Sequence, residues 1–114
     1  MTKGYWIVRV DVRDEAAYRE YAAANGPAFA KFGGRFLVRG GAFEAVTGQA
    51  RARNVVLEFP SYEDALACWH SDLYQEARAK QRGGTEAEII VIGGYEGEQP
   101  STSVPATAST PDSE

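Results

Sequence analysis

Four stretches of the chain carry the hydrophobic patterns that are typical of β-strands. In residues 4–12 the side chains alternate, with Trp6, Val8 and Val10 on one face and a mixed set on the other, which is the two-residue period of a strand. Residues 53–59 contain a short run of β-branched and bulky apolar residues, a pattern that favours a strand buried on both faces. We therefore expect four strands, over residues 4–12, 35–39, 53–59 and 86–93.

Two helical regions separate these strands. Asp14 is placed to cap the first region, which has an apolar stripe and a polar face, as an amphipathic helix does. Asn25-Gly26-Pro27 then interrupts the pattern, and proline lacks the backbone donor that a helix interior needs. We therefore expect a kink or a second short helix over residues 27–32, ended by the two glycines that follow.

The second helical region follows Pro60. Ser61 can cap it, and Asp64 stands three residues further on, which is the spacing of a capping box. Ser71 offers a second start, so the sequence predicts a helix that is broken and restarted. One apolar stripe at helical spacing is expected to lie against the sheet; its members are Leu66, Trp69, Leu73 and Ala77.

The order β-α-β-β-α-β predicts an α+β domain of the ferredoxin-like type, a four-stranded antiparallel sheet with the helices on one face. Several strands nevertheless place apolar side chains on both faces, as Ile7 beside Trp6 and Ile90 beside Ile89 show. An exposed apolar face of this size marks an association surface, and the simplest partner is a second copy. We therefore predict a homodimer through the sheet face, which would form a dimeric α/β barrel.

Composition narrows the class of protein. The 114 residues carry a formal charge of −4, which gives no general attraction to nucleic acid, and no stretch approaches the roughly 20 apolar residues of a membrane span. Cys68 is the only cysteine, so an internal disulfide is excluded and a cytoplasmic location is expected. Residues 1–96 are predicted to form one domain, and residues 97–114, rich in Ser, Thr and Pro, a disordered tail.

Glu58 and Asp11 are the first candidates for catalysis. A carboxylate in an apolar strand must be paired or must shift its pKa, and Glu58 lies in such a strand. We expect the first and third strands to be adjacent and parallel, which would bring Asp11 to the same end of the sheet. Two neighbouring carboxylates can divide the acid and base roles, but carboxylates at strand ends also cap helices or pair with arginines.

His70 is the only histidine and the third catalytic candidate. It follows Trp69, which takes the buried side of the helix and turns His70 toward solvent, so an exposed structural role competes with a role as base or ligand. A metal site would need carboxylates for every other ligand, and the glycine pairs lack the G-x-G-x-x-G spacing of a dinucleotide site. We therefore expect neither a cofactor nor a bound metal.

A ligand-binding cleft is predicted between the sheet and the second helical region. Tyr74 and Arg78 share a helix face, with Ser71 one turn earlier, and this polar stripe is expected opposite the core stripe. Glu58 ends the strand that leads into this helix, and Arg39 reaches over from the hairpin side. An ion pair of Arg39 with a glutamate and a dimer contact for the polar stripe are the competing interpretations.

Three segments together resemble the domain-of-unknown-function family 1330: GYW near the start, FGGRFLVRGG at residues 32–41, and RNVVLEFPSYEDALACWHSDLYQEAR at residues 53–78. The resemblance covers roughly residues 4–94. It implies a dimeric α/β barrel, in a superfamily that includes cofactor-free monooxygenases and small-molecule decomposing enzymes. The residues at the family's recurrent positions are all present: Tyr18, Tyr21, Arg39, Gly40, Gly41, Glu44, Arg53, Glu58, Trp69, Ser71, Tyr74 and Arg78.

These observations favour a small-molecule-binding, dimeric α/β-barrel domain. Its candidate chemistry is cofactor-independent proton transfer or oxygenation of a small organic acid or phenol. A non-catalytic dimerisation or regulatory module is the first alternative, and haem or metal binding through His70 is the second. No sequence motif decides whether the domain is an enzyme.

Overall fold

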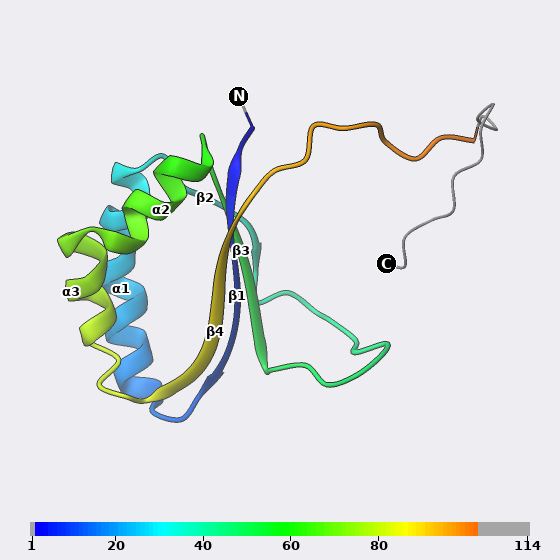
Figure 1. Cartoon of the computed structure of the whole chain (residues 1–114). Coiled ribbons are helices and arrows are strands. Elements are labelled where there is room, and N and C mark those ends of the chain that lie inside the picture. The colour runs from blue at the N-terminus through cyan, green and yellow to red at the C-terminus, as the bar shows by residue number, and fades with distance from the viewer. Residues whose placement is uncertain (1, 103–114) are drawn as a thin grey trace.

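The computed structural model describes residues 2–102 of the chain. Its elements are β1 (Gly4–Val12), α1 (Glu15–Lys31), β2 (Arg35–Arg39), β3 (Arg53–Phe59), α2 (Tyr62–His70), α3 (Asp72–Ala79) and β4 (Thr85–Gly93). The strands form one antiparallel sheet in the order β2-β3-β1-β4, and the helices cover one of its faces (Figure 1). This is the predicted α+β, ferredoxin-like arrangement, with the second helix divided in two.

The strand directions correct one expectation. β1 and β3 are adjacent but antiparallel, with Tyr5 opposite Glu58 and Val10 opposite Arg53. The expected parallel pairing is wrong because the crossover through α1 makes β1 parallel to β2, and the hairpin connection then reverses β3. Asp11 therefore lies at the opposite end of the sheet from Glu58, and the two carboxylates do not form a pair.

α1 runs through Pro27 as one helix, so the expected second short helix is wrong. Asp14 caps it as expected, because its side chain accepts a hydrogen bond from the Ala17 amide. Asn25 and Phe29, on either side of the proline, are both buried. Packing on both sides of Pro27 therefore stabilises the helix, although the proline removes a backbone hydrogen bond.

The break between α2 and α3 falls at Ser71, as predicted. The Ser71 hydroxyl donates to the Cys68 carbonyl at 2.7 Å and accepts from the Tyr74 amide at 3.1 Å, so one side chain ends α2 and caps α3. The break also resets the helical phase, and the predicted apolar stripe is partly wrong. Leu73 is 37% exposed and Tyr74 only 1%, so Tyr74 belongs to the core and not to a polar stripe opposite it.

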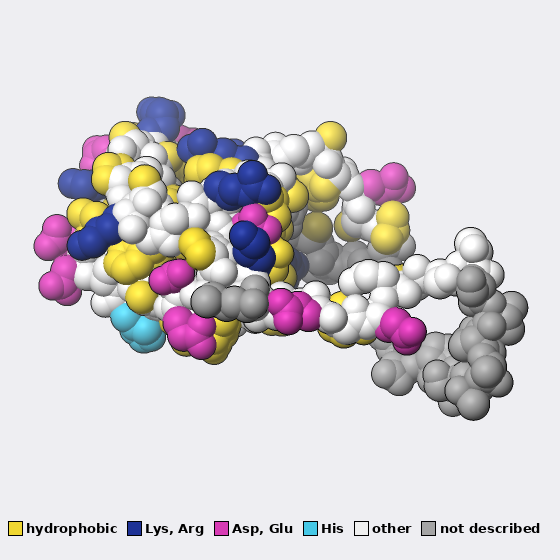
Figure 2. All heavy atoms as spheres, turned by 90° about the horizontal axis from the view of Figure 1, so that it is seen from above, with side chains coloured by type: hydrophobic (Ala, Val, Ile, Leu, Met, Phe, Trp, Pro, Cys, Tyr) yellow, Lys and Arg dark blue, Asp and Glu magenta, His cyan; other side chains and the backbone are white. Residues whose placement is uncertain are grey.

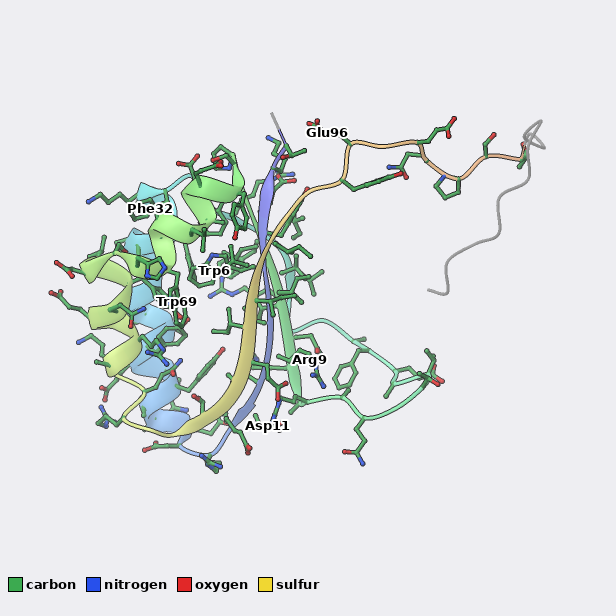
Figure 3. All side chains as sticks on the ribbon, viewed as in Figure 1. Trp6, Arg9, Asp11, Phe32, Trp69 and Glu96 are labelled. Carbon is green, nitrogen blue, oxygen red and sulfur yellow. The ribbon has the colours of Figure 1, made fainter. Side chains whose placement is uncertain are left out.

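Trp6 stands at the centre of the core, between the helices and the inner face of the sheet. Its ring lies between 4.9 and 5.8 Å, centroid to centroid, from those of Phe29, Phe59, Trp69 and Tyr74. Its indole N–H donates to a carbonyl of α2 at 2.9 Å. Figure 3 shows Trp6 and Trp69 in the layer between helices and sheet. Aromatic packing therefore joins the two layers.

The outer face of the sheet carries apolar side chains that none of the described helices covers. Ile7 and Ile90 pair across β1 and β4 and are 37% and 52% exposed. Ile92 on β4 and Leu37 and Val38 on β2 are also exposed. We call these five residues the outer patch. Its position on the uncovered face agrees with the two-sided apolar pattern in the sequence.

Residues 97–102 contain no helix or strand and are exposed. The remainder of the predicted tail, residues 103–114, lies outside the described residues. Within residues 2–102, none of the helices combines the length and the apolar character that crossing a membrane requires. Basic and acidic side chains are interspersed over the face seen in Figure 2.

Candidate functional site

A cavity of about 310 Å³ lies between the helices and the inner face of the sheet. Aromatic side chains from both the sheet and the helices line it, including Trp6 on β1, Phe36 on β2, Tyr18 on α1, Trp69 on α2 and Tyr74 on α3. Ligand pockets in proteins typically have volumes of about 300 to 1,000 Å³. The cavity therefore has the size and the walls of a site for a small molecule.

A bulge in β2 turns Arg39 into this cavity. The β2–β3 register shifts between Phe36 and Val38, and side chains alternate strictly only along a regular strand. Without the extra residue, Arg39 would point to the outer face; with it, Arg39 lies opposite the inward-facing Val55. Bulges commonly redirect a side chain in this way. The Arg39 guanidinium then lies 4.2 Å from the Phe36 ring centroid.

Arg53 reaches the cavity from β3. Its guanidinium lies 5.5 Å from the Tyr18 ring centroid and against Gly40, where an added Cβ would come within 3.2 Å of it. The Nε of Arg53 is buried and has no hydrogen-bond partner among the described residues. An unsatisfied buried donor of this kind costs about 1 to 3 kcal/mol.

Arg78 reaches the cavity from the helix layer. It lies on α3, and its guanidinium is 4.9 Å from the Trp69 ring centroid. One of its nitrogens donates to the Gln75 side chain at 3.2 Å. This distance is that of a cation–π contact, and Arg78 has no carboxylate partner within residues 2–102.

We call Arg39, Arg53 and Arg78 the cavity arginines. No aspartate or glutamate lines the cavity beside them, and none of the three forms an ion pair within residues 2–102. Several arginines elsewhere do have carboxylate partners, as in Arg35–Glu58, Arg51–Asp11 and Arg82–Glu20. In a chain with a net charge of −4, this local excess of positive charge marks a site suited to an anion.

Two tyrosine hydroxyls meet at the cavity wall. The Oη atoms of Tyr21 and Tyr74 are 2.8 Å apart and buried, and both residues line the cavity. Burial is the main cause that raises the pKa of both phenols above the ordinary value for tyrosine. Both hydroxyls therefore remain protonated at neutral pH, so they act as hydrogen-bond donors and not as bases.

Glu58 lies on the outer face of the sheet and does not line the cavity. Its carboxylate accepts hydrogen bonds from Arg35 at 3.0 Å and from the Tyr5 hydroxyl at 3.1 Å. The hydrogen bond from Arg35 is the main cause that lowers the pKa of Glu58. Glu58 is thus a paired, ionised carboxylate outside the cavity, because the odd-numbered residues of β3 are the ones that face inward.

Three further candidates also lie outside the cavity. Asp11 accepts hydrogen bonds from the Arg51 side chain and the Ala52 amide, both at 2.8 Å, and Figure 3 shows it at the end of the sheet away from Trp6. His70 is exposed and borders a separate, shallow hollow. The Ser71 hydroxyl is occupied by its capping bonds.

The structure therefore brings together three of the five predicted cleft residues: Arg39, Tyr74 and Arg78. Glu58 and Ser71 are not part of the cavity wall. A ligand-binding role for the three residues that line the cavity stays a prediction. No group of three or more His, Cys, Asp or Glu side chains within residues 2–102 is arranged to hold a metal ion.

Sequence reasoning did not assign Arg53 and Tyr21 to the cleft. Arg53 lies on the inner face together with Val55 and Leu57, which follow it at every second position, and this two-residue period is visible in the sequence. Tyr21 belongs to the apolar stripe of α1, where its burial is expected but its hydroxyl partner is not. The bulge that redirects Arg39 leaves no recognisable sequence signal.

Solved structures share this fold. The chain is similar to the methylated RPA0582 protein, with a TM-score of 0.68 and 17% identity over 86% of this chain and 84% of that chain. The RPA0582 protein of unknown function from Rhodopseudomonas palustris gives a TM-score of 0.66 and 19% identity, over 84% and 85% of the two chains. SnoaB, a cofactor-independent oxygenase from Streptomyces nogalater, gives 0.57 and 12%, over 90% and 100%. At these identities the likeness establishes the fold alone.

Sequence comparison identifies the family. No curated protein matches the chain. Residues 3–95 match the family described as Domain of unknown function (DUF1330), a region that includes all the described helices and strands. The resemblance found in the sequence is thereby confirmed, and the chain belongs to the DUF1330 family.

Proposed function

We propose that the cavity between helices and sheet binds a small organic acid or phenol. The observation that carries this proposal is the combination of aromatic walls with the three cavity arginines, which have no acidic partner among the described residues. Aromatic walls favour a planar, apolar ligand body. Guanidinium groups favour a carboxylate or a phenolate oxygen.

The chemistry that best fits this wall is one in which the bound molecule supplies its own electrons or proton. A phenol or an enol placed beside guanidinium groups ionises more readily, because nearby positive charge favours the anion. One hydroxyl of the Tyr21–Tyr74 pair donates to the other, and the second can donate to the oxygen that becomes negative. Cofactor-independent oxygenation or proton transfer has these requirements, and the fold that the chain shares with SnoaB, a cofactor-independent oxygenase, supports this proposal.

A non-catalytic binding or regulatory module is the second candidate. The observation that favours it is the absence of a carboxylate or an imidazole from the described cavity wall, because a general base is most often one of these groups. The two candidates share the same ligand site. They differ in whether the bound molecule changes.

We also propose that the domain acts as a homodimer through the outer patch. The five residues of this patch form an apolar surface on the uncovered face of the sheet, and an isologous dimer would bury it against itself. Residues 40–52 extend past the outer side of the sheet (Figure 1) and carry Phe43 and Val46, which are 54% and 85% exposed. This loop is therefore placed to contact a second copy.

A thermal-shift screen of small organic acids and phenols tests the ligand proposal. A ligand at 100 times its Kd stabilises the protein by about 2.7 kcal/mol, which raises the Tm of a domain of this size by roughly 10 °C or more. Arg39→Gln should reduce this shift, whereas Arg13→Gln, an exposed arginine outside the cavity, should not. The proposal fails if no acid or phenol shifts the Tm.

Oxygen consumption and proton release with the best ligand then separate an enzyme from a binding module. Turnover supports the first candidate, and binding with the ligand recovered unchanged supports the second. An absorbance spectrum of the purified protein tests the haem alternative. A band near the Soret region that disappears in a His70→Ala variant would replace both candidates.

A further inference from the structure

We propose that the cavity selects a dicarboxylate, with one carboxylate held by Arg39 and Arg53 and the other by Arg78. This inference rests on the proposed ligand site and specifies the class of its ligand. The three guanidinium groups enter from different parts of the wall: β2, β3 and α3. Because there are three positive charges and they come from different elements, we expect a ligand with two carboxylates.

Arg39 and Arg53 are positioned to act on one group. Arg39 pairs with Val55 across the β2–β3 ladder, and Arg53 is two residues from Val55 on the same inner face. Diagonal neighbours of this kind lie about 7 to 8 Å apart at the backbone. Two side chains as long as arginine can therefore converge from this spacing on the oxygens of a single carboxylate.

Both guanidinium groups lie over aromatic rings. Arg39 is 4.2 Å from the Phe36 ring centroid and Arg53 is 5.5 Å from that of Tyr18, and the missing side chain of Gly40 leaves room for the Arg53 group. Neither arginine has a carboxylate partner among the described residues. The N–H edge of a guanidinium is the part that binds a carboxylate in a bidentate manner.

Arg78 supplies a separate positive charge from the opposite layer. It lies over the ring of Trp69, which belongs to α2 and not to the strands that carry the other two arginines. A monocarboxylate bound by Arg39 and Arg53 would leave Arg78 without an anionic partner. A ligand with two negative charges therefore balances the three positive charges better than a ligand with one.

The size of the cavity restricts the linker between the two carboxylates. The volume of about 310 Å³ is at the small end for ligand sites. The lining includes apolar side chains such as Val8 and Ile89 and polar ones such as Asn25, Gln81 and Thr85. The structure therefore favours a short dicarboxylate.

Calorimetric titration of the full-length protein tests the inference with matched probes. The probes are succinate, glutarate, adipate and terephthalate, each compared with its own monomethyl ester, which keeps the linker and removes one charge. In the wild-type protein at least one diacid should bind about tenfold or more tightly than its monoester, the usual size of a charge-assisted hydrogen bond. Phenol and benzoate serve as probes without a second carboxylate.

The variants assign the two ends of the ligand. Arg78→Gln should remove the preference for the diacid, so that diacid and monoester bind equally. Arg39→Gln and Arg53→Gln should weaken both ligands by about tenfold or more, and Arg13→Gln should change neither. Circular dichroism and the Tm identify a variant that does not fold; Arg39 is exposed, so its variant carries the test if Arg53→Gln unfolds.

The outcomes separate this inference from the proposed function. Equal binding of diacids and monoesters by the wild-type protein overturns the dicarboxylate inference, and it leaves the organic-acid site intact. Binding of phenol or benzoate alone has the same meaning. A loss in Arg13→Gln equal to that in Arg78→Gln would show an effect of net charge and overturns the inference as well. If none of the probes binds, the dicarboxylate inference fails, and if no acid or phenol of the thermal-shift screen binds either, the proposed function fails as well.

Discussion

Replacing Ile90 by glutamate places a charge in the outer patch and should dissociate the proposed dimer. Ile90 lies on β4 opposite Ile7 and is 52% exposed in the single chain. In the dimer this exposed half would contact the partner. The substitution therefore changes the free energy of association far more than the free energy of unfolding of one chain.

The magnitude follows from the exposure and the symmetry. Burying a whole isoleucine is favourable by about 1.5 to 3 kcal/mol, so the half that is exposed offers roughly 1 kcal/mol per copy. The glutamate must also lose water at the interface, which costs a further few kcal/mol unless it finds a partner. Because a two-fold interface contains each substitution twice, the total is at least about 5 kcal/mol, or a Kd raised by about 10³ to 10⁴.

Light scattering coupled to size-exclusion chromatography measures the effect. The wild-type protein should elute with twice the chain mass of 12.4 kDa, and Ile90→Glu with the mass of one chain and an unchanged circular dichroism spectrum. Leu57→Glu is the matched control on the inner face, where the residue is 1% exposed. This control should unfold the chain, because the carboxylate would be buried in the core.

Two results would refute the reasoning. A wild-type protein that is a monomer at micromolar concentration, with native secondary structure, would show that the outer patch is stable in water. An Ile90→Glu variant that remains a dimer would place the interface elsewhere.

Three further predictions concern single side chains. Tyr74→Phe should lower the free energy of unfolding by about 1 kcal/mol, because it removes the buried hydrogen bond to Tyr21 but keeps the ring; chemical denaturation measures this, and a loss near the 3 to 5 kcal/mol of a ring deletion would contradict it. Cys68 should react with a thiol reagent only after denaturation, since burial raises the pKa of its thiol to about 12; rapid reaction of the folded protein would show that the thiol is accessible. The main cause that lowers the pKa of Asp11 is its hydrogen bond from a backbone amide, and Arg51 adds to the shift. The ionised Asp11 therefore stabilises the folded chain above the ordinary carboxyl pKa of about 4, and this contribution is lost as pH falls below it. Arg51→Gln should reduce the pH dependence of the free energy of unfolding in acid, and an unchanged dependence would show that Arg51 does not contribute to it.

Much of the fold can be predicted because the strand patterns are strong. The alternation in β1 predicts both the existence and the faces of that strand, and the apolar run in β3 predicts the existence of the other. The bounds of β1, β2 and β3 match the expected ranges. Local patterning is sufficient here because each strand buries its inner side chains against the same helix layer.

The errors arise where local signals do not decide. The phase of α3 depends on the angle at which the chain restarts after Ser71, so the burial of Tyr74 cannot be derived from spacing through the break. The direction of β3 follows from the topology of the whole sheet. The expected proximity of Asp11 and Glu58 required a parallel β3 and is therefore wrong. Pro27 predicts a helix break from local chemistry, but the packing of α1 overrides it.

The candidate site is harder to predict than the fold. The sequence places Arg39 at the end of a strand and Arg78 on a helix that packs near it. Whether the two line one cavity depends on the bulge in β2 and on how the core side chains pack around that cavity. Arg53 has the same parity as the inward-facing residues of β3, but an arginine at the start of a strand can equally form an ion pair at the surface. The absence of acidic partners becomes apparent only in three dimensions.

The most direct test of the proposed site is a crystal structure of the protein grown with the acid that binds most tightly. We expect ligand density inside the cavity, with carboxylate oxygens within hydrogen-bond distance of the Arg39 and Arg53 guanidinium groups. Density for the ligand only outside the cavity, with water alone between the cavity arginines, would contradict the account.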